Sequence, residues 1–147
     1  MEGTAEKEAL WRTASKYFLH GILFSGLMLV LAFVWAILFV VLVVAGFIIG
    51  LIIGILVLFI IIGGLNNFLT DAIWGIRVKS GWKSILGHGF ILFIVLIAAH
   101  IPAIIINIVS PNVVTAVVLF VLYAFIDGFL AKSVAGYWEE EENEEVT

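Results

Sequence analysis

Two histidines and two aspartates lie where they could meet at one membrane surface. His20 and His88 each precede a glycine near the start of a long apolar stretch, and Asp71 and Asp127 lie toward the ends of such stretches. Imidazoles and carboxylates together could bind a metal ion or relay protons. The spacing matches no helical metal-binding motif, so the alternative is that these groups cap helix ends, reach toward water and pair with nearby cations.

His100 is the ionisable residue that the sequence places deepest in an apolar segment. It falls about 14 residues into the expected third helix, roughly 20 Å from the start of that helix at 1.5 Å per residue. An ionisable group at this depth is a candidate functional residue. It either lines a wet path or is a neutral packing residue opposite Leu119 and Phe120, and we expect the second. Pro102 follows it and predicts an irregular turn in the helix.

The chain contains no cysteine, which excludes disulfides, thiolate metal sites and thiol catalysis. No nucleotide-binding or catalytic motif is present either. We therefore expect no catalytic residue, no metal, no cofactor and no nucleic-acid partner, and we do not expect an enzyme.

The elements that must position these side chains are membrane helices. The chain is 64% hydrophobic and 12% charged, whereas soluble domains are about half apolar and about a quarter charged. Two uncharged stretches are each about twice the roughly 20 residues that one spanning helix needs. The sequence predicts an all-α integral membrane protein with four transmembrane helices arranged as two antiparallel hairpins.

This architecture divides the chain into five segments. They are an interfacial amphipathic segment at 1–17, a first hairpin at 18–66, a basic and aromatic cytoplasmic linker at 67–85, a second hairpin at 86–133 and an acidic disordered tail at 134–147.

Small residues locate the first turn. Gly46, Gly50 and Gly54 form a GxxxGxxxG row, and small residues let helices approach closely in lipid. Pairing Gly50 with Ala36 and Gly54 with Ala32 puts the turn near residue 43. The row either packs within the chain in this way or forms the seam of a homo-oligomer.

Charge sets the expected orientation. The seven Lys and Arg residues all fall on the side of the termini and the middle linker. The positive-inside rule then places both termini in the cytoplasm, with the protein in the plasma membrane. Arg77, Lys79 and Lys83 lie among tryptophans, so the linker could attract anionic lipid headgroups. The alternative is that these cations only set the topology.

The two halves resemble each other weakly. His20-Gly21 and His88-Gly89 both follow a Trp–cation pair, and Asp71 and Asp127 both precede a tryptophan by the same interval. A tandem repeat and a shared membrane-boundary composition both explain this similarity.

Three classes of function remain after these exclusions. We expect a structural or accessory subunit of a membrane complex or homo-oligomer, with the bilayer, further copies of itself or other membrane subunits as partners. A small oligomeric channel or transporter is the main alternative, because His100 lies deep in a helix. A membrane-embedded enzyme is the least expected class, because an enzyme needs a convergent polar cluster and the polar groups of the two halves form none that is evident.

Overall fold

The computed structural model describes residues 2–78 and 81–137, which form four long helices and no strand. They are α1 (Glu2–Ala45), α2 (Phe47–Trp74), α3 (Trp82–Val109) and α4 (Val113–Gly136). All four are long and apolar enough to cross a membrane. The structure thus confirms an all-helical protein whose four apolar helices are each long enough to cross a membrane.

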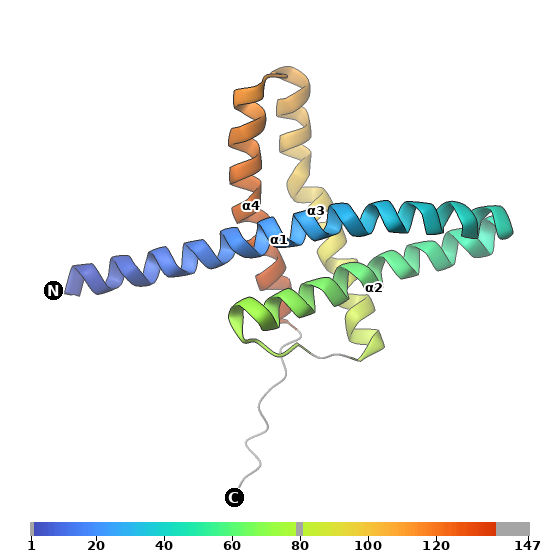
Figure 1. Cartoon of the computed structure of the whole chain (residues 1–147), viewed down its shortest axis with the longest axis horizontal. Coiled ribbons are helices and arrows are strands. Elements are labelled where there is room, and N and C mark those ends of the chain that lie inside the picture. Colours follow the sequence, from blue (N-terminus) through green and yellow to red (C-terminus); the bar gives the residue numbers. More distant parts are fainter. Residues whose placement is uncertain (1, 79–80, 138–147) are drawn as a thin grey trace, which may run out of the picture.

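The helices form two antiparallel pairs that cross each other (Figure 1). We call α1 with α2 the first hairpin, and α3 with α4 the second. α1 packs against α4 where the hairpins cross, and α2 packs against α3. The two turns lie far apart, so the hairpins diverge beyond the crossing.

Several predicted boundaries differ from those of the structure. Residues 1–17 were expected to be a separate interfacial segment, but α1 runs without a break from Glu2 to Ala45. α2 continues past residue 66 to Trp74, which shortens the linker. Its end is set by Gly75, whose φ of 69° is left-handed and whose N–H bonds the carbonyl of Asp71 at 2.9 Å.

The other end of the chain differs in the same way. Residues 134–136 still belong to α4, with Val134 and Ala135 buried. The remainder of the predicted acidic tail, from residue 138 onward, lies outside the described residues, and so does Lys79. The second turn lies in the polar segment from Asn107 to Asn112, where α3 ends at Val109 and Asn112 caps α4 by accepting a 2.8 Å hydrogen bond from the Thr115 N–H.

The first hairpin has a different register from the one predicted. The turn falls at Gly46, and a Cβ on Gly50 would overlap the carbonyl of Leu42 rather than meet Ala36. The pairing of Ala36 with Gly50 was therefore wrong. Gly50 and Gly54 do pack against α1 within the chain, with Gly54 facing the Phe39 ring.

Four other glycines make close backbone contacts between the two hairpins. A Cβ on Gly21 would overlap the Ala124 carbonyl, and one on Gly128 would overlap the Tyr17 carbonyl, where α1 crosses α4. The crossing of α2 and α3 repeats this geometry, with Gly63 against the Ile85 carbonyl and Gly89 against the Phe59 carbonyl. Where backbones touch in this way, the van der Waals attraction between the helices is strong. This attraction matters in lipid, because no hydrophobic effect drives helices together there.

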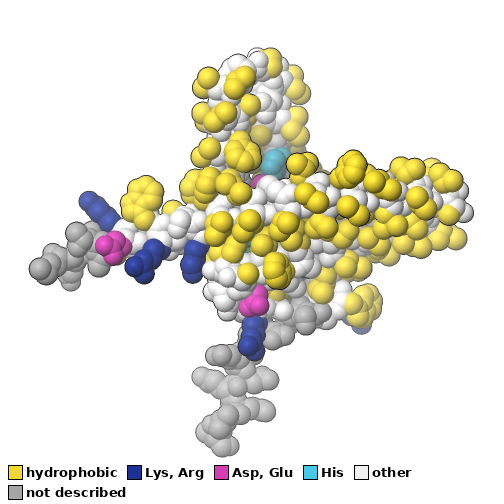
Figure 2. Space-filling view, in the orientation of Figure 1, with side chains coloured by type: hydrophobic (Ala, Val, Ile, Leu, Met, Phe, Trp, Pro, Cys, Tyr) yellow, Lys and Arg dark blue, Asp and Glu magenta, His cyan; other side chains and the backbone are white. Residues whose placement is uncertain are grey.

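The crossing region holds the core. Its buried apolar residues come from all four helices and are Phe24, Ile62, Leu69, Leu92, Ala131 and Val134. Figure 2 shows apolar side chains covering both hairpins, with Lys and Arg side chains gathered on the N-terminal part of α1 and toward the linker. Among the described residues, neither turn carries a cation.

Candidate functional site

Asn66 is the centre of a buried polar network. Its side chain is fully buried in α2, as are His20 of α1 and His88 of α3. Asn66 Oδ1 lies 3.0 Å from His20 Nε2, and Asn66 Nδ2 lies 2.7 Å from His88 Nε2. Asn66 Nδ2 also donates to the Ala131 carbonyl oxygen of α4 at 2.9 Å. One amide therefore joins all four helices.

The amide fixes which histidine nitrogens carry hydrogen. Its oxygen only accepts and its nitrogen only donates, so His20 Nε2 donates and His88 Nε2 accepts. His20 Nδ1 then accepts, and the Trp74 Nε1–H donates to it at 3.1 Å. His20 is consequently a neutral imidazole with both nitrogens in use, which leaves it no lone pair for a metal ion.

Trp74 extends this network toward the charged side of the molecule. Lys16 Nζ and Lys132 Nζ lie 5.4 and 5.6 Å from the centre of the Trp74 ring, within reach of a cation–π interaction. The Tyr17 ring packs against the Trp74 ring, and their centroids are 4.7 Å apart. The tryptophan thus connects α1, α2 and α4 at their polar ends.

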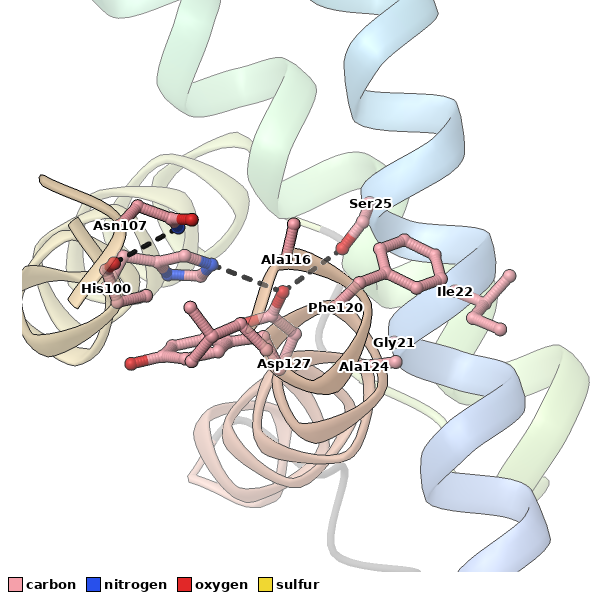
Figure 3. Close-up of a pocket in the computed structure, with 12 residues that line it drawn as sticks. Gly21, Ile22, Ser25, His100, Asn107, Ala116, Phe120, Ala124 and Asp127 are labelled. Carbon is pink, nitrogen blue, oxygen red and sulfur yellow. Dashed lines mark hydrogen bonds and ion pairs between the residues drawn. The ribbon is translucent and has the colours of Figure 1, made fainter. Parts of the chain in front are cut away.

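Asp127 is the centre of a second polar cluster, nearer the turns of the hairpins (Figure 3). The aspartate is 5% exposed. Its Oδ2 accepts a 3.1 Å hydrogen bond from Ser25 of α1 and lies 3.6 Å from His100 Nε2 of α3. Asp127 was expected at the end of its helix beside a cation, but it lies within α4 and pairs with a histidine.

His100 has one nitrogen committed to its own helix. Its Nδ1 lies 2.8 Å from the Leu96 carbonyl oxygen, which can only accept, so Nδ1 carries hydrogen. Its ring also packs on Tyr123, with centroids 4.6 Å apart. His100 was predicted to be a packing residue rather than to line a wet path, and its side chain is 39% exposed.

Two cavities meet at this second cluster. One, of about 310 Å³, lies between α1, α3 and α4. The other, of about 480 Å³, lies in the cleft where α1 and α2 part from α3. Ser25, His100 and Asp127 line both cavities. Leu119 and Phe120, expected opposite His100, line the first.

The remaining predicted residues lie on the linker side. Asp71 is exposed and lines a cavity of about 430 Å³ with Arg77 and Asn67. Both polar atoms of the Asn67 amide are buried without a hydrogen-bond partner among the described residues. Lys83 Nζ lies 5.6 Å from the Trp82 ring centroid. Asp71 therefore joins neither His20 nor Asp127.

The four residues predicted to share one surface thus divide among three places. His20 and His88 meet at Asn66, Asp127 meets His100, and Asp71 stands apart. No group of three or more His, Asp or Glu within residues 2–78 and 81–137 could hold a metal ion. Sequence reasoning gave no role in the second cluster to Ser25 or Tyr123, although both are polar residues in apolar helices.

Comparison with known proteins adds no further assignment, because no family model, no curated protein and no solved structure matches this chain.

Proposed function

We propose that this chain is a structural or accessory subunit of the plasma membrane that assembles with further copies of itself through the cleft between its hairpins. The observation that carries the proposal is an unused small-residue face on α1. Ala32 and Ala36 are exposed, and Ala32 lines the cleft. Small residues spaced four apart are where helices associate most closely in lipid.

The glycine row is not the contact surface between copies in this proposal. Because Gly50 and Gly54 already pack on α1, they are not available as a seam between copies. The face with Ala32 and Ala36 is the one left for a second copy. In the proposed orientation both termini are cytoplasmic, since the described cations lie on the side opposite the turns.

Assembly can be tested with one bulky substitution on α1 and a matched control substitution on α3. Ala32→Leu should lower the oligomer size of the full chain in mild detergent, because added bulk prevents close backbone contact. Ala98→Leu is the matched control, since Ala98 is exposed on α3 and lines neither cavity at the second cluster. A wild-type chain that is monomeric in both detergent and lipid nanodiscs contradicts the proposal.

The linker cations supply a second kind of partner. We propose that the linker cations Arg77, Lys79 and Lys83 attract anionic headgroups at about 1 kcal/mol per cation. Flotation of the chain's soluble linker peptide, residues 74–84, with vesicles containing phosphatidylserine should exceed flotation with neutral vesicles. Equal flotation would leave these cations only a topological role.

A small channel or transporter is the second candidate function. It is favoured by the pairing of Asp127 with His100 inside helices that are long enough to cross a membrane. Ionisable groups at such depth are costly, and they mark binding sites and ion pathways in many membrane proteins. Solute or proton flux into liposomes containing the purified chain tests this candidate, with Asp127→Asn as the variant that should abolish flux.

A further inference from the structure

The cavity of about 310 Å³ between α1, α3 and α4 has an unusual balance of hydrogen-bonding groups. Its polar lining residues are Ser25, His100, Asn107, Tyr123 and Asp127. Most of their donor hydrogens are already directed at protein oxygens. The Ser25 hydroxyl donates to Asp127, and the Tyr123 hydroxyl donates to the Ala99 carbonyl at 2.8 Å.

The two remaining donors follow the same pattern. His100 Nδ1 donates to the Leu96 carbonyl at 2.8 Å, and Asn107 Nδ2 donates to the Ala103 carbonyl at 3.1 Å. Each of these bonds returns to the donor's own helix. The cavity therefore offers a ligand very few hydrogens.

The acceptors, in contrast, are not all used by donors of the protein. Asp127 Oδ1 is buried and has no hydrogen-bond partner among the described residues. In neutral His100, Nε2 holds a lone pair because Nδ1 carries the hydrogen, and it lies 3.6 Å from Asp127 Oδ2. Two acceptors that face each other at this separation are suited to a donor that bonds both.

The rest of the wall is apolar. Ile22, Ala103, Leu119, Phe120 and Ala124 line the cavity around the polar cluster. The volume is near the lower end of the range for small-molecule sites, which are mostly apolar with a few placed polar groups. A bare metal ion would leave most of this space and all of its apolar wall unused.

We propose that this cavity is a binding site for a small organic amine in its ammonium form. The ammonium donates to Asp127 and to His100 Nε2, and its apolar body lies against Phe120 and Leu119. A buried carboxylate without a full set of partners is costly, and a cationic donor removes that cost. The site is independent of the proposed assembly role, since Ala32 and Ala36 do not line this cavity.

Phenethylamine and 2-phenylethanol form a matched pair of probes, because they share an aromatic body and only the first is a cation at neutral pH. Isothermal titration of the full chain in nanodiscs should show saturable phenethylamine binding. The alcohol should bind at least about tenfold more weakly, since a charge-assisted hydrogen bond contributes about 1.5–3 kcal/mol and 1.4 kcal/mol is tenfold. Equal binding of the two probes, or no saturable amine binding, would overturn the proposal.

Variants locate the binding within the chain. Asp127→Asn should lose phenethylamine binding, while Asp71→Asn should keep it, because Asp71 lies in a different cavity. Retained binding in Asp127→Asn contradicts the site. If Asp127→Asn does not fold, Ala116→Phe gives the same information, because Ala116 lines the cavity and makes none of the described polar contacts there.

Two controls complete the test. Ala98→Phe adds the same bulk on the exposed side of α3, outside both cavities, and should bind like the wild type. Amine binding that survives Ala116→Phe assigns the amine to lipid. Amine binding that is displaced by sodium chloride but not by choline chloride assigns the cavity to an inorganic cation. Either result defeats the proposal, whereas oligomer size in the same samples reports on assembly separately.

Discussion

His20 and His88 belong to different hairpins, and each bonds a different atom of one buried amide. His20 donates to the Asn66 oxygen, and His88 accepts from the Asn66 nitrogen. The hydrophobic effect does not hold helices together within lipid, so hydrogen bonds and close packing do so instead. This pair, bridged by Asn66, joins the hairpins at their crossing.

Asn66→Ala should therefore destabilise the whole fold. It removes three interhelical hydrogen bonds, to His20, His88 and the Ala131 carbonyl. At about 0.6 kcal/mol for each such bond in membrane proteins, the expected loss is roughly 2 kcal/mol. Chemical unfolding in mixed micelles measures it. Asn67→Ala is the control, since the Asn67 amide bonds no described residue and its loss should cost little.

Gly21→Ala should also destabilise the protein, through the backbone rather than through a side chain. The added Cβ would overlap the Ala124 carbonyl and force α1 away from α4. Overpacking of this kind costs about 1–3 kcal/mol. Gly26→Ala, in the same helix, meets open space and should be neutral or stabilising by up to about 1 kcal/mol, because alanine favours helix. Equal melting temperatures for the two variants would show that the crossing is not as close as described.

Gly50→Leu distinguishes packing within the chain from packing between copies. A side chain on Gly50 would collide with the Leu42 carbonyl of α1, so the melting temperature in detergent should fall. Oligomer size should not change, because this contact lies inside one hairpin. Gly46→Leu serves as the control, because a Cβ at Gly46 meets nothing within 4 Å. A change in oligomer size with an unchanged melting temperature would restore the glycine row as a seam between copies.

The proposed orientation can be read directly by thiol labelling, because the native chain has no cysteine. Cysteine at Gly46 or Asn112, in the two turns, should react with an impermeant maleimide on intact cells. Cysteine at Gly81, in the linker, should react only after permeabilisation. Labelling of Gly81→Cys from outside would reverse the assignment of both termini.

The two halves of the chain correspond to each other in space at their glycine contacts but not at their aspartates. His20-Gly21 on α1 and His88-Gly89 on α3 occupy matching positions, since each glycine contacts the backbone of a helix in the other hairpin. The matching residues on the other two helices are Gly128 and Gly63, which contact these glycines' helices in the same way. Asp71 and Asp127, matched by their distance from a tryptophan, differ in burial and in partners.

The sequence alone determined the helices and their number. Long uncharged stretches leave the backbone no partner in lipid other than itself, so helices of spanning length follow from composition. The polar Asn107-to-Asn112 segment located the second turn for a local reason, since proline and an asparagine cap end helices. The uniformly apolar first turn carried no such signal, and its predicted position and register were wrong for that reason.

The tertiary structure decided most of the contacts between polar groups. The predicted first hairpin ended at residue 66, yet Asn66 lies inside α2, because a buried amide with partners on three other helices need not reach water. Asp127 gave no sign in the sequence that its partners would be Ser25 and His100, since that depends on how α1 and α3 cross α4. Composition places these side chains in helices that are long and apolar enough to cross a membrane. The crossing of the helices decides their neighbours, because contacts between apolar helices depend on a few small residues, and sequence spacing does not specify how those residues pair.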